Sequence, residues 1–104
     1  MWLFLTEGFF SIVAHKYKPE HFLIRCRNRK HMKAVFPDAE MYELLDVDYR
    51  YRADVPKEIV LKLIGEQMAN MDEPNFKSSI KELDYYNAAI LVWRVMYDYG
   101  LIHG

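Results

Sequence analysis

A chain of 104 residues can bury one hydrophobic core but is too short for two, so we expect a single domain over residues 1–104. Apolar residues make up 52% of the chain and aromatic residues 15%, which excludes a disordered protein. The formal net charge of -1 and a pI near 6.4 exclude a strongly basic domain that binds nucleic acid by charge alone.

Alternating apolar and polar residues predict three strands at the start of the chain. The first two are residues 2–5 and 9–15, and the turn between them contains Gly8, which can adopt a positive φ, so we expect a hairpin. Residues 21–27 form the third predicted strand. Its two faces are Phe22, Ile24 and Cys26 on one side and Leu23, Arg25 and Arg27 on the other.

A short helix and two more strands are expected next. Asn28 can cap a helix that continues to about Val35 or Phe36, where the following proline ends it. Residues 40–44 look extended. The segment 49–54 alternates again, with Tyr49, Tyr51 and Ala53 on one face and Arg50, Arg52 and Asp54 on the other.

From Pro56 onwards the periodicity becomes helical. Proline is typical of a helix start, and the amphipathic stripe that follows consists of Val60, Leu63, Ile64, Gln67, Met68 and Met71. A last helix is predicted from about Phe76 or Ser78 to Tyr99, with Gly100 as its left-handed cap. The element order βββαββα plus a long C-terminal helix predicts an α+β fold, in which helices cover one face of an antiparallel sheet.

The last helix is apolar on nearly every side over residues 88–97, so one buried stripe cannot account for it. It is either enclosed within the monomer or in contact with another chain. Tyrosine and tryptophan are enriched at interfaces because they bury a large area and keep a polar tip. We therefore predict a protein interface, in a homodimer or with another protein, that includes Tyr85, Tyr86, Trp93, Tyr97 and Tyr99.

Several segments, spread in order over almost the whole chain, resemble one family. They are Met-Trp-Leu-Phe at 1–4, Ser-Ile-Val-Ala-His-Lys at 11–16, Leu-Ile-Arg at 23–25, Tyr-Arg-Tyr-Arg-Ala at 49–53, Asn-Phe-Lys at 75–77 and Val-Trp at 92–93. The chain is similar in these segments to a family of small uncharacterised proteins of bacteria and their phages. The resemblance implies a compact cytoplasmic protein and brings no activity with it. The acidic Leu-Asp-Tyr-Tyr at 83–86 differs from the His-rich segment associated with that position.

Charge is distributed unevenly along the chain. Residues 1–33 carry seven lysines and arginines against two glutamates, whereas the rest carries seven against thirteen acidic residues. The candidate surface for nucleic acid or another anionic partner consists of Arg25, Arg27, Arg29, Lys30, Lys33, Arg50 and Arg52. The alternative is a solvated face whose arginines pair with acids such as Glu43 and Asp54.

No catalytic, metal or cofactor motif is present in the sequence. His15, His21 and His31 lack the spacing of zinc ligands, and the four glycines are too scattered for a phosphate-binding loop. The lone Cys26 is typical of a reducing compartment, and the apolar start lacks the features of a signal peptide. We therefore expect a soluble, cytoplasmic, non-enzymatic protein, with a small enzyme or ligand binder that uses His15, His21 or tyrosines in a cleft as the alternative.

Overall fold

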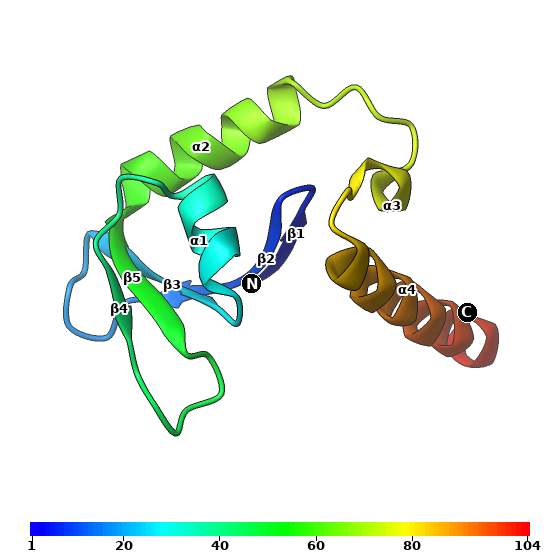
Figure 1. Cartoon of the computed structure of the whole chain (residues 1–104), viewed down its shortest axis with the longest axis horizontal. Coiled ribbons are helices and arrows are strands. Elements are labelled where there is room, and N and C mark those ends of the chain that lie inside the picture. Colours follow the sequence, from blue (N-terminus) through cyan, green and yellow to red (C-terminus); the bar gives the residue numbers. More distant parts are fainter. The chain divides into compact units, whose positions relative to one another are not determined.

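The computed structural model describes residues 1–104 and confirms the α+β prediction (Figure 1). The elements are β1 (Trp2–Leu5), β2 (Gly8–Ala14), β3 (His21–Cys26), α1 (Arg29–Val35), β4 (Met41–Glu43), β5 (Tyr51–Pro56), α2 (Lys57–Ala69), α3 (Phe76–Ser79) and α4 (Leu83–His103). The chain divides into two compact units, Met1–Asp72 and Glu73–Gly104.

The first unit contains one five-stranded antiparallel sheet with the strand order β1-β2-β3-β5-β4. The predicted hairpin between β1 and β2 is confirmed, with Leu5 opposite Gly8. Gly8 has no positive φ, however, so the predicted reason for the glycine is wrong. A β-carbon at Gly8 would lie 2.7 Å from His31 Cβ and 3.2 Å from His31 Cα, so the glycine permits close approach of β2 to α1.

Helices α1 and α2 lie on the same face of the sheet and close the core (Figure 1). Met32 and Val35 come from α1 and Val60 comes from α2. They pack on the buried strand residues Phe10, Ile12, Ile24, Cys26, Ala53 and Val55, which are the alternate residues of β2, β3 and β5. The other face of each strand therefore points away from both helices, and this face contains Arg25.

The predicted Asn28 cap of α1 is confirmed, because the Asn28 side chain accepts a hydrogen bond from the Lys30 backbone N–H at 2.9 Å. The predicted stripe of α2 holds only over the first half of that helix. Val60 is buried and Leu63 packs on the core, but Met68 and Met71 are 67% and 59% exposed. Met68 near the end of α2 and Met71 beyond it thus contribute little to the core.

The second unit differs from the single long helix predicted at the C-terminus. The short α3 ends at Ser79, and α4 starts after Glu82, whose carboxylate accepts hydrogen bonds from the backbone N–H groups of Asp84 and Tyr85. Gly100 does not end the helix, because α4 continues to His103. Although α4 has 21 residues, neither it nor any other helix combines the length and hydrophobicity of a membrane span.

Candidate interaction surfaces

In the structure, some of the predicted basic residues pair with carboxylates and others do not. Arg27 forms an ion pair with Asp48 at 3.0 Å. Arg29 and Arg50 share Glu43, at 3.0 Å and 3.2 Å, and hydrogen bonds from the two guanidinium groups lower the pKa of the Glu43 carboxyl. These three arginines are exposed, and each already has a carboxylate partner. The lysines Lys30 and Lys33 are exposed on α1.

Arg25 and Arg52 are different, because neither forms an ion pair. They lie directly opposite each other on β3 and β5, on the face away from the helices. Arg25 Nη2 donates to Ser11 Oγ at 2.6 Å, and Arg52 Nε donates to the Tyr49 carbonyl at 3.0 Å. Arg25 Nε is buried without a hydrogen-bond partner. Both guanidinium groups are thus positioned by neutral groups and keep an unneutralised charge.

Tyr49 departs from the predicted alternation. Arg25 and Arg27 lie over the Tyr49 ring, 4.8 Å and 4.1 Å from its centroid, whereas Arg50 lies 5.7 Å from the Tyr51 ring centroid. The strand itself begins only at Tyr51, so the alternation does not extend back to Tyr49. The buried Tyr49 ring therefore supports the arginines of β3 by cation–π contact.

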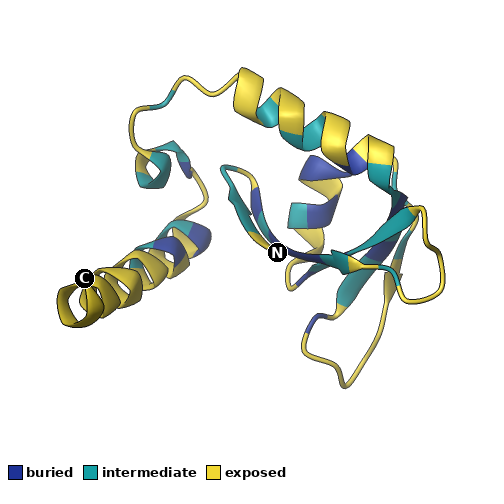
Figure 2. Ribbon diagram, turned by 180° about the vertical axis from the view of Figure 1, so that it is seen from behind, coloured by how far each residue is buried: buried dark blue, intermediate teal, exposed yellow.

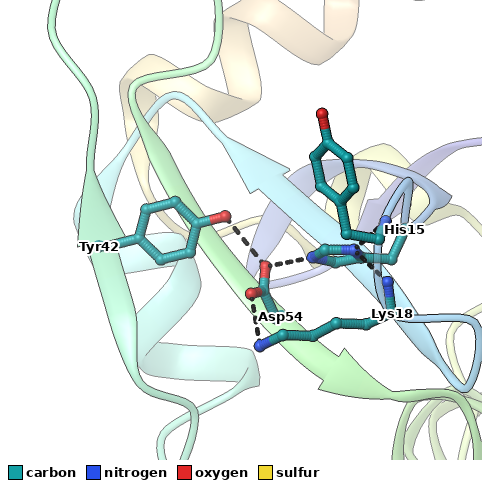
Figure 3. A network of polar contacts seen from close by, with 5 residues as sticks. His15, Lys18, Tyr42 and Asp54 are labelled. Carbon is teal, nitrogen blue, oxygen red and sulfur yellow. Dashed lines mark hydrogen bonds and ion pairs between the residues drawn. The ribbon is translucent and has the colours of Figure 1, made fainter.

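A polar network around Asp54 joins three segments of the first unit (Figure 3). One carboxylate oxygen accepts from Tyr42 Oη at 3.0 Å and lies 3.1 Å from His15 Nε2, and the other lies 3.1 Å from Lys18 Nζ. Partial burial opposes ionisation of Asp54, but hydrogen bonds from Lys18, Tyr42 and His15 outweigh it and lower the pKa of the carboxyl. Sequence reasoning missed this network because its members lie far apart along the chain. Lys18 and Asp54, for example, are 36 residues apart.

His15 is held in one tautomer by this network. Its Nδ1 accepts from the backbone N–H groups of Tyr17 and Lys18, at 3.1 Å and 3.0 Å, so the proton is on Nε2 and points to Asp54. Both ring nitrogens are occupied. This arrangement anchors the turn after β2 to β5 and leaves no nitrogen to act as a general base.

His15 and His21 form neither a metal site nor the lining of the groove beside α2. The His15 and His21 rings are 6.5 Å apart, but no three His, Cys, Asp or Glu side chains converge as metal ligands would. A groove of about 280 Å³ lies where the first turns of α2 meet residues 36–40, with Asp54, Val55 and Pro56 along it. Neither histidine lines this groove, so the cleft that a His-based enzyme would need is not found there.

The largest exposed apolar surface of the second unit is on α4. We call it the α4 patch, and it consists of Leu91, Val92, Trp93, Val95, Met96, Tyr97, Tyr99, Leu101 and Ile102. Every residue from Leu91 onwards is exposed, and Figure 2 shows this half of α4 in the colour of exposed residues throughout. Among the predicted interface residues, Tyr85 is buried and Tyr86 is half-buried, whereas Trp93, Tyr97 and Tyr99 belong to the patch.

The patch is ordered along the helix rather than scattered. Trp93 and Tyr97 stack with ring centroids 5.4 Å apart, and Tyr99 lies 4.8 Å from the His103 ring. Lys77 from α3 places its ammonium 5.0 Å from the Trp93 centroid.

Comparisons with protein-family models, curated proteins and solved structures give no match to this chain.

Proposed function

We propose that this chain is a non-enzymatic interaction protein that forms a homodimer through the α4 patch. The observation that supports this proposal is the exposure of large apolar side chains on α4, from 40% for Val92 to 77% for Ile102. Proteins that remain monomeric in water rarely expose contiguous apolar patches of more than a few hundred Å². A partner that covers this helix removes its apolar side chains from water, which is favourable.

The patch leaves a large apolar area in water. Trp93, Tyr97 and Tyr99 are 47%, 51% and 58% exposed. Since an aromatic side chain buries ~150–250 Å², these three rings alone leave roughly 200–400 Å² in water. Six aliphatic residues of the patch add to this area. At about 3.6 residues per turn these side chains surround α4, so a single partner covers only part of this area.

The charges on α4 favour a second copy over a charged partner. Between Leu91 and Ile102 the only charged residues are Arg94 and Asp98, which pair with each other at 3.4 Å on the helix surface. This segment of α4 therefore carries no net charge that would select an acidic or a basic protein. It can meet its own copy about a twofold axis without like-charge repulsion.

The spacing of residues on α4 is also suited to a partner helix. Tyr85, Ala89, Val92, Met96, Tyr99 and His103 follow each other at alternating steps of four and three, which is the seam of a helix pair. Tyr85 and Ala89 are buried within the chain at 7% and 6% exposure. Val92, Met96 and Tyr99 continue the same line into solvent, so they are the expected centre of the dimer contact.

The single, unpaired Cys26 supports a reducing compartment such as the cytoplasm.

Sedimentation equilibrium tests the proposal. The wild type should have twice the chain mass of 12.5 kDa at micromolar concentration, and the double variant L91E/M96E should be a monomer. The matched control is L61E/M68E on α2, where Leu61 and Met68 are 64% and 67% exposed, compared with 68% and 58% for Leu91 and Met96. The control should remain a dimer. A monomeric wild type at the highest attainable concentration would overturn the proposal, as would equal dissociation of the two double variants.

A further inference from the structure

A single row of residues crosses the face of the sheet that points away from α1 and α2. The register places Trp2 opposite Ser11, Ser11 opposite Arg25, Arg25 opposite Arg52, and Arg52 opposite Tyr42. We call these five residues the cross-strand row. The row contains one residue from each strand. Each of them is next in sequence to a residue that packs on the core, and side chains alternate along a strand, so all five point to the face opposite the core.

The centre of the row carries two positive charges without a counter-charge. Like charges directly opposite on neighbouring strands destabilise a sheet, yet Arg25 and Arg52 form no ion pair. Two carboxylates of the same part of the chain have other partners, since Asp54 contacts Lys18 and Asp48 pairs with Arg27. An anion bound at the centre of the row would therefore neutralise both guanidinium groups, and arginine forks match phosphate oxygens.

Both ends of the row are aromatic. Trp2 is 71% exposed, so most of its indole is accessible, and its ring lies edge to face with the Phe9 ring at a centroid distance of 6.0 Å. Tyr42 is 40% exposed, and its hydroxyl is fixed by the hydrogen bond to Asp54. At ~4.8 Å per strand spacing, the row is about 19 Å long. RNA-binding sheets of similar width stack two or three bases on their aromatic residues.

We infer that the cross-strand row binds a single strand of nucleic acid, with its phosphates on Arg25 and Arg52 and its bases against Trp2 and Tyr42. An acidic protein surface would supply carboxylates for the arginines, whereas a single nucleic-acid strand supplies both phosphates for the arginines and flat bases for Trp2 and Tyr42, so the charged centre and aromatic ends together favour nucleic acid. This inference is independent of dimer formation through α4. RNA and DNA share the required phosphates and bases, and the experiment distinguishes them.

Fluorescence anisotropy with labelled oligouridylate and oligothymidylate of about a dozen nucleotides tests the inference. Two phosphate contacts predict that binding weakens about sevenfold between about 50 mM and 200 mM salt. The variant R25Q/R52Q should bind at least about tenfold more weakly than the wild type. The control R29Q/R50Q removes the same charge from arginines that pair with Glu43, and it should change affinity by no more than about twofold.

Stacking has its own readout. In the variant W93F, Trp2 is the only tryptophan, so its fluorescence should be quenched as the oligonucleotide binds. Because Arg25 also holds Ser11, the single variant R52Q is included to separate lost binding from lost folding, with circular dichroism as the check. It should remain folded and still bind more weakly than the wild type.

Four results would overturn the inference. They are no binding of either oligonucleotide at low salt, equal losses in the two double variants, an unquenched Trp2 in the bound state, and polyglutamate competing as well as oligonucleotide. The last result would indicate an acidic protein as the partner. Preference for one oligonucleotide over the other would support the inference and identify the sugar that the row accepts.

Discussion

Substitution of Gly8 by alanine tests why a glycine begins β2. An added β-carbon would lie 2.7 Å from His31 Cβ, 2.8 Å from His31 Cγ and 3.2 Å from His31 Cα. The distances to His31 Cβ and Cγ are shorter than β-carbon contacts in real structures, and His31 Cα is a backbone atom that cannot move away without the helix. Helix α1 would have to move from the sheet, and overpacking of this kind costs about 1–3 kcal/mol of the free energy of unfolding.

Urea denaturation followed by circular dichroism measures this loss. A double-mutant cycle with His31→Gly makes the test specific, because removal of the His31 side chain removes the two closest contacts. G8A should cost less in the H31G background than in the wild type, by about 1 kcal/mol or more. An unchanged cost would show that the backbone conformation of Gly8 matters rather than its contact with α1. A G8A variant as stable as the wild type would refute the packing argument itself.

Two further predictions concern buried and half-buried groups. Burial raises the pKa of the Cys26 thiol, which is fully buried and donates to the Asn28 carbonyl, so a thiol reagent should modify Cys26 only after unfolding; rapid modification of the native protein would contradict this. The pKa of Asp54 is lowered in the folded state, so its ionised form stabilises the fold above the unfolded value of about 3.9, and this contribution is lost as the pH falls through the lower folded value. D54N should therefore be less stable than the wild type near neutral pH, and the difference measured by urea denaturation should disappear in acid.

The sheet could be predicted from the sequence because its signals are local. Alternation identified β1, β2 and β3, and the change to a helical period at Pro56 identified the start of α2. The helix ends were harder to place. Gly100 is a typical helix stop, but it lies within an exposed helix where nothing forces the chain to turn. The break before α4 depends on capping by Glu82, which composition does not indicate.

The surfaces could be predicted only in outline. The clustering of basic residues was visible in the sequence, but which of them are neutralised depends on contacts between distant segments. Glu43 is 14 residues from Arg29 along the chain, and Asp48 is 21 residues from Arg27. Arg25 and Arg52 become distinct only when the register of β3 and β5 is known. Sequence therefore indicates that a basic face exists, and the sheet topology indicates which charges on it are free.

The two proposals together make a prediction that neither makes alone. A dimer formed through the α4 patch carries two cross-strand rows, and a second row that engages the same strand binds at a high effective concentration. The monomeric variant L91E/M96E should thus bind an oligonucleotide of about a dozen nucleotides as well as the wild type does. A strand of several dozen nucleotides should bind the wild type at least about tenfold more tightly than the variant, since only the dimer can use two rows. Equal losses for short and long strands would contradict this argument, because they would show that α4 itself contacts the nucleic acid.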